Sequence, residues 1–125
     1  MSQILVDTHA LLWWLADDDA LSADAHDAIA DPANEPLVSV ATLWELAIKR
    51  RLGKLQAPDS LPETVVEQGF LWLGIAPDHA WGVTTLPDHH RDPFDRLLVS
   101  QAISERAPIV SADEQLAPYE VEIIW

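Results

Sequence analysis

Four carboxylates lie either directly after an apolar segment or in the first turn of a predicted helix: Asp7, Glu45, Asp95 and Asp113. Two carboxylates about 4 Å apart repel each other by about 4 kcal/mol at an effective dielectric near 20. Converging acids therefore need protons or divalent cations, and Mg²⁺ and Mn²⁺ prefer oxygen ligands of this kind. Because such a pocket can activate water and stabilise an in-line attack on phosphorus, the acids predict a metal centre for phosphate-ester hydrolysis.

These acids meet only if the elements that carry them share one edge of a sheet. Short apolar segments predict strands over 4–6, 37–40, 71–75, 109–111 and 121–124. The segments between them predict helices over 8–16, 22–30, 42–52, 61–68 and 93–106, and a short one after Asp78. This alternation predicts one α/β domain over 1–125, a three-layer α/β/α sandwich around a mainly parallel sheet of four to five strands. Functional side chains gather beyond the carboxyl ends of such strands, where we expect the four acids.

Each acid also has a purely structural interpretation. Glu45 completes a capping box if Thr42 caps its helix, and it lies four residues before Lys49, the spacing of a helical ion pair. The three aspartates suit the end of a strand or the N-terminus of a helix. The functional interpretation is favoured because all four acids fall at one predicted sheet edge.

Four motifs occur in a fixed order along the chain: Val6-Asp7-Thr8-His9, Trp44-Glu45-Leu46-Ala47-Ile48-Lys49, His90-Arg91-Asp92-Pro93-Phe94-Asp95-Arg96 and Ser111-Ala112-Asp113. With this spacing, over residues 4–124, the sequence resembles PIN-domain ribonucleases, and among them the VapC-type toxins of bacterial toxin–antitoxin pairs. The resemblance implies a compact α/β/α fold and a Mg²⁺- or Mn²⁺-dependent endoribonuclease that leaves a 5′-phosphate. It also implies a homodimer inhibited by a cognate antitoxin.

The resemblance also assigns roles to individual positions. The metal-binding quartet of the family corresponds to the four carboxylates, with Glu45 completing the metal shell or positioning the attacking water. Thr8 and Ser111 match small hydroxyl positions that orient ligands or water. Asp92 matches an often acidic position outside the ligands, and capping of the following helix is its structural alternative.

The charge of the chain limits its partners. Seven Lys and Arg residues against 21 Asp and Glu residues give a net charge of −14, which disfavours broad binding to nucleic acid or anionic membranes. Six basic residues nevertheless lie on segments that carry the motifs: Lys49, Arg50, Arg51, Lys54, Arg91 and Arg96. We expect them to contact a short structured RNA or the antitoxin. Their alternative is a solvated cluster that complements a helix C-terminus.

Several other classes of protein and site are disfavoured. The chain has no cysteine, which excludes disulfides, thiolate metal sites and cysteine nucleophiles. Its longest apolar run, 10–16, is too short to cross a bilayer, so we expect a soluble cytoplasmic protein without membrane association. A HAD-like phosphatase needs a second aspartate where His9 stands, and a receiver domain needs an acid pair after the first strand. A non-catalytic dimerising or antitoxin-binding module on the same fold is the remaining alternative.

Aromatic and histidine side chains invite functional interpretations that we rank second. Packing is favoured over base stacking for the tryptophans, and Trp14 and Trp44 are expected to face the sheet. His89 and His90 lie in the longest polar loop, so solvated side chains are favoured over a metal or acid–base role.

Overall fold

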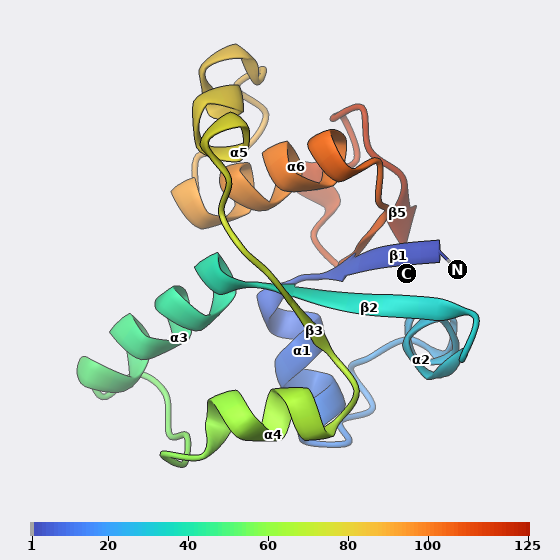
Figure 1. The fold of residues 1–125 in the computed structure, drawn as a ribbon, viewed down its shortest axis with the longest axis vertical. Coiled ribbons are helices and arrows are strands. Elements are labelled where there is room, and N and C mark those ends of the chain that lie inside the picture. Colours follow the sequence, from blue (N-terminus) through green and yellow to red (C-terminus); the bar gives the residue numbers. More distant parts are fainter. Residues whose placement is uncertain (1) are drawn as a thin grey trace.

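The computed structural model describes residues 2–125, which form a five-stranded sheet covered by helices on both faces (Figure 1). The strands are β1 (Ser2–Val6), β2 (Asn34–Ser39), β3 (Leu71–Leu73), β4 (Ile109–Val110) and β5 (Ile123–Ile124). Their order is β3-β2-β1-β4-β5, and every neighbouring pair is parallel. The predicted three-layer α/β/α architecture is confirmed.

The helices lie in two layers on either side of the sheet. They are α1 (Thr8–Leu15), α2 (Ala23–Ala30), α3 (Val40–Arg51), α4 (Leu61–Glu67), α5 (Pro77–Gly82) and α6 (Pro93–Glu105), with short 3₁₀ turns η1 (Val83–Thr85) and η2 (Glu114–Leu116). In Figure 1, α1, α2 and α4 cover one face, while α5 and α6 lie over the other. Over residues 2–125, no helix has both the length and the apolar character that a bilayer span requires.

The central strand β1 belongs to two hydrophobic cores at once. Ile4 and Val6 pack into the core beneath α1, α2 and α4, whereas Leu5 packs into the core beneath α6. Successive side chains of a strand point to opposite faces of a sheet, so burial on both faces requires an unbroken apolar run. This double burial fixes the position of Asp7, the residue that follows β1.

The boundary between β2 and α3 differs from the prediction. β2 begins at Asn34 because its first residues pair with β1, where Ser2 lies opposite Asn34. The strand ends at Ser39, whose hydroxyl accepts a hydrogen bond from the Ala41 amide at 3.0 Å and caps α3. Thr42 therefore lies inside the helix, and the predicted capping box with Glu45 is wrong.

The prediction for Trp44 is also wrong, whereas Trp14 packs inward. Trp14 contacts the core residue Phe70 edge-on, with 6.3 Å between the ring centroids. Trp44 is 59% exposed because α3 turns Ala41, Leu46 and Glu45 inward instead. Its ring packs edge-on against Phe94 of α6 at 5.3 Å, and this pair lies beside the segments that carry two of the predicted acids.

Candidate functional site

The four predicted acids belong to segments that meet at the carboxyl edge of the sheet, where α1, α3 and α6 begin (Figure 1). Asp7 is 5% exposed and caps α1 by accepting a hydrogen bond from the Ala10 amide at 2.9 Å. Burial raises the pKa of Asp7, and hydrogen bonds from the Ser111 side chain and from Ala10 lower it in part. The negative charge of Asp113 raises it further. Asp7 is therefore a buried carboxyl whose ionised form costs free energy in the metal-free protein.

Glu45 is held in place by one hydroxyl and one ammonium group. It lies inside α3 and is 8% exposed. The Thr8 hydroxyl donates a 2.7 Å hydrogen bond to its Oε1, and the Lys49 ammonium lies 3.0 Å from its Oε2. Glu45 therefore forms the helical ion pair that was its structural alternative, and it also lies at the site. Thr8 supplies the link between Glu45 and the segment that follows β1.

Asp95 reaches the site from the first turn of α6. Asp92 caps this helix, since its carboxylate accepts hydrogen bonds from the amides of Phe94 at 2.8 Å and of Asp95 at 3.2 Å. Asp92 thus has the capping role given as its alternative. The Asp95 carboxylate does not cap the helix, and its Oδ2 lies 3.2 Å from His90 Nε2.

The electrostatics of Asp95 show that the acids influence one another. Burial and the charge of Asp92 raise its pKa from 3.8 to about 7, and His90 opposes them. The charges of Asp7 and Glu45 add to the increase. A carboxyl with this pKa is only partly ionised near neutral pH, so the site favours any species that supplies compensating positive charge.

Asp113 enters the site from the turn after β4. Its Oδ1 accepts a hydrogen bond from the Gln115 amide at 2.9 Å and caps η2, as its structural alternative requires. Its own amide donates to the Ser111 hydroxyl oxygen at 3.0 Å. Since Ser111 also hydrogen-bonds Asp7, this buried serine joins the ends of β1 and β4.

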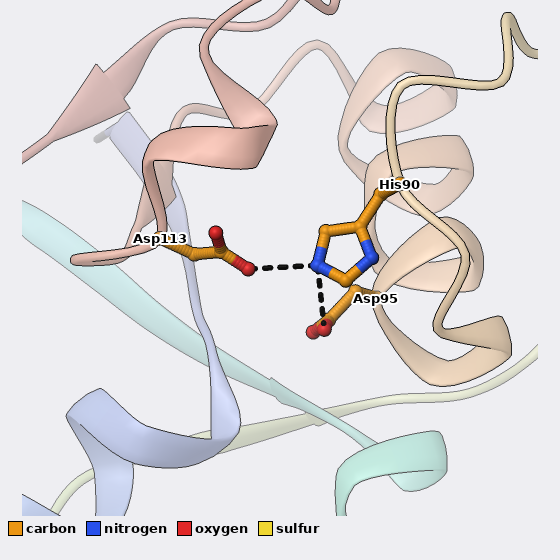
Figure 2. A group of neighbouring side chains, drawn as sticks. All are labelled: His90, Asp95 and Asp113. Atoms are coloured by element: carbon orange, nitrogen blue, oxygen red, sulfur yellow. Dashed lines mark hydrogen bonds and ion pairs between the residues drawn. The ribbon is translucent and has the colours of Figure 1, made fainter.

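His90 lies between Asp95 and Asp113, as Figure 2 shows. Its Nε2 is 2.8 Å from Asp113 Oδ2 and 3.2 Å from Asp95 Oδ2. Its Nδ1 accepts a 3.0 Å hydrogen bond from the Asp92 amide, so the neutral ring carries its proton on Nε2, facing the carboxylates. Only 11% of the side chain is exposed, and the prediction of a solvated His90 is wrong.

His90 is thus the site residue that sequence reasoning missed. Its neighbour His89 is exposed, with its ring edge-on to Tyr119 at 5.0 Å. The available signal was the spacing of two residues from His90 to the helix cap Asp92, which lets that amide turn back onto the ring. Histidine in a polar loop does not by itself predict such a turn.

The donor set is suitable for a divalent cation. One ligand atom from each of His90, Asp95 and Asp113 can be chosen so that all lie within 4.8 Å of one another. Carboxylate oxygens suit Mg²⁺ and Mn²⁺, and imidazole also suits transition metals. The raised pKa of Asp95 gives a further reason for the fit, because a cation would offset the burial and the repulsion from Asp92 that together raise it.

The predicted basic residues separate into two groups. Lys49 pairs with Glu45, and Arg50 binds the Asp59 carboxylate and the Ala57 carbonyl, so both stabilise the fold around α3. Arg96 points inward to backbone carbonyls of the loop before α6. Arg51, Lys54 and Arg91 are exposed, and so is Arg50, although Asp59 engages its guanidinium group.

Comparison with known proteins finds a related sequence and solved structures of similar fold. The chain is 29% identical over 119 residues to Ribonuclease VapC22 of Mycobacterium tuberculosis, an alignment that covers 93% of this chain and 91% of the relative. Its fold is similar to a chain in the crystal structure of VapBC2 from Rickettsia felis bound to a promoter DNA fragment, with a TM-score of 0.72, 13% identity, and coverage of 97% and 96%. It is also similar to a chain of a toxin–antitoxin complex from Klebsiella pneumoniae, with a TM-score of 0.63, 16% identity, and coverage of 94% and 92%.

The assignment to a family rests on the match over most of the sequence. The PIN domain model matches residues 4–121, a range that contains all four acids and His90. The chain therefore belongs to the PIN domain family.

Proposed function

We propose that this protein is a Mg²⁺- or Mn²⁺-dependent endoribonuclease, the toxin of a VapBC-type toxin–antitoxin pair. The observation that carries the proposal is that the carboxylates of Asp95 and Asp113 converge on one nitrogen of His90, at 3.2 and 2.8 Å. The charges of Asp7 and Glu45, from two other segments of the chain, also act on Asp95. Its 29% identity to a protein named as a ribonuclease supports the substrate class. The PIN family match supports the use of a divalent metal.

In this proposal the four acids have two roles, cation binding and orientation of the attacking water. Asp7, Asp95 and Asp113 hold the cation, while Glu45 completes its shell or orients the attacking water. A bound Mg²⁺ or Mn²⁺ supplies an activated water and neutralises charge that develops on the phosphate. Through its Nε2–H, His90 supplies these acids with a hydrogen-bond donor, and with that proton in place Nε2 has no lone pair to offer the cation.

The hydroxyl groups of Thr8 and Ser111 form hydrogen bonds that hold the acids in place. Thr8 fixes one oxygen of Glu45 through its 2.7 Å hydrogen bond and leaves the other to Lys49. Ser111 hydrogen-bonds Asp7 and accepts from the Asp113 amide, so one side chain orients two acids. Partners of this kind set the orientation of metal ligands in proteins.

We expect purified protein to cut total cellular RNA with Mn²⁺ or Mg²⁺, and not with excess chelator, because a bound cation is needed to activate the attacking water. Sequencing of the cleaved ends should locate discrete sites in short structured segments and find 5′-phosphates. Asp31→Asn serves as control, since Asp31 is an exposed acid that caps the turn before β2, at the opposite edge of the sheet from the site. Cleavage that persists in chelator contradicts the metal-dependent mechanism.

The exposed basic residues of the α3 end are proposed to contact RNA phosphates. The double variant Arg51→Glu, Lys54→Glu is expected to weaken RNA binding severalfold and to reduce its salt dependence, because two phosphate contacts are lost. Filter binding in chelator at several salt concentrations measures this without cleavage. The control is Arg106→Glu, the basic residue outside the motif segments. An unchanged affinity and salt slope would assign Arg51 and Lys54 to the solvated cluster.

An antitoxin and a second copy of this chain are the proposed protein partners. The two solved structures of similar fold come from toxin–antitoxin complexes, which supports the antitoxin. Exposed apolar side chains on α3, spaced four residues apart, provide surface of the kind that protein interfaces bury: Val40, Trp44, Ile48 and Leu52. Partner binding without any RNA cleavage in Mn²⁺ would favour the non-catalytic module instead.

A further inference from the structure

We infer that Arg96 and Tyr119 are positioning residues, which clamp the loop before α6 so that His90 holds Asp95 and Asp113 together. This inference rests on the proposed function, in which those acids bind the cation. Neither residue touches an acid of the site directly, apart from the position of Arg96 next to Asp95 in the chain. Their contacts are with the backbone of the loop and with each other.

Arg96 gathers the loop around a single guanidinium group. Its Nη1 donates to the carbonyls of Pro87 at 3.0 Å and His90 at 3.3 Å. Its Nη2 donates to the carbonyls of Val83 at 3.3 Å and Leu86 at 3.4 Å. The side chain is only 15% exposed, so these hydrogen bonds are partly shielded from water. A planar fork with five N–H donors suits four carbonyls spread over eight residues, whereas a lysine ammonium concentrates its donors at one point.

Tyr119 binds the same loop through its hydroxyl group. Its hydroxyl oxygen accepts a 2.9 Å hydrogen bond from the His90 amide and a 3.4 Å hydrogen bond from Arg96 Nη1. The ring is 5% exposed and packs in the core beneath α6. The backbone of His90 is therefore held at its N–H by Tyr119 and at its C=O by Arg96.

With the backbone of His90 fixed, the contacts of its ring determine where the side chain lies. The Asp92 amide donates to Nδ1, and Nε2 is directed at the two carboxylates (Figure 2). The clamp thus connects residue 119, near the end of the chain, to the acids that follow β4 and open α6. Loss of the clamp is expected to free the loop and to let Asp95 and Asp113 separate.

The test uses two variants that remove clamp contacts with little change of shape, Tyr119→Phe and Arg96→Lys. Tyr119→Phe keeps the buried ring and removes only the acceptor. We expect calorimetry at fixed pH to show Mn²⁺ affinity reduced about tenfold or more, as is usual when supporting partners of metal ligands are lost. In the metal-free variants, the NMR signal of the His90 Nε2–H is expected to shift or to disappear through exchange with water.

Two control variants separate the clamp from general stability and from surface charge. Val65→Ala opens a cavity in the core on the opposite face of the sheet, so it lowers stability without touching the loop. Asp88→Asn removes the exposed carboxylate 3.5 Å from Arg96 Nη1. Both controls should bind Mn²⁺ like the wild type and keep the His90 signal.

Wild-type Mn²⁺ affinity and an unchanged His90 signal in both clamp variants would overturn the inference. The proposed function fails differently, through a wild-type protein that neither binds Mn²⁺ nor cuts RNA. In that event the His90 signal of the metal-free variants still decides whether Arg96 and Tyr119 position the ring.

Discussion

An Asp7→Asn variant is expected to lose at least about a hundredfold in RNA cleavage while its metal-free fold becomes more stable. Loss of even an outer partner of a metal ligand costs 10–100-fold in affinity or activity, and Asp7 is proposed as a ligand itself. The asparagine carbonyl can still accept from the Ala10 amide and cap α1. Stability rises because burial opposes ionisation of Asp7 and the charge of Asp113 adds to this cost.

Cleavage rates in Mn²⁺ and melting temperatures in chelator measure the two effects separately. Asp31→Asn is the matched control, because that exposed carboxylate also accepts a backbone hydrogen bond, from the Ala33 amide at 2.9 Å. It should change neither quantity appreciably. Near-wild-type cleavage by Asp7→Asn would remove Asp7 from the site, and a less stable metal-free variant would show that burial of its charge is not the governing cost.

The four acids were predictable because local rules determine where they lie. An apolar run that ends in Asp7 identifies a buried strand and its carboxyl end, and Pro93 after Asp92 identifies the start of α6. Once the strands are parallel, topology alone brings Asp7 and Asp113 to one edge. No knowledge of side-chain contacts between distant segments is needed for that step.

The roles of His90 and Arg96 were not predictable in this way. The backbone amide of His90 is held by a hydroxyl that lies 29 residues further along the chain, on Tyr119. Arg96 was expected to be exposed and to contact RNA. Instead, the loop before α6 folds over its guanidinium group, which donates to the carbonyls of that loop. Trp44 is a related case, since α3 turns inward a face that includes the charged Glu45, which Thr8 binds, and leaves the larger apolar Trp44 outside.

The metal-free protein is expected to lose stability as the pH rises from 5 to 8, and Asp95 is the main expected source of this loss. Its pKa is raised from 3.8 to about 7 in the folded state, so the folded protein still holds a proton at pH 5 that the unfolded chain has already released, and it loses this proton as the pH rises through 7. Unfolding therefore becomes easier as the pH rises, and the contribution is lost by about pH 8. A loss on the order of 2 kcal/mol is expected, because a quarter of the side chain meets solvent.

Asp95→Asn isolates this contribution, because His90 keeps Asp113 as a partner in both proteins. Urea unfolding in chelator at pH 5, 6, 7 and 8 should show a free-energy difference between variant and wild type that grows with pH in favour of the variant. Added Mn²⁺ should stabilise the wild type at pH 8 and leave the variant nearly unchanged, since binding to the folded state alone raises stability by mass action. A difference that stays constant from pH 5 to pH 8 would mean that the pKa of Asp95 is not raised into this range, and the electrostatic reason for a cation at this edge of the sheet would be lost.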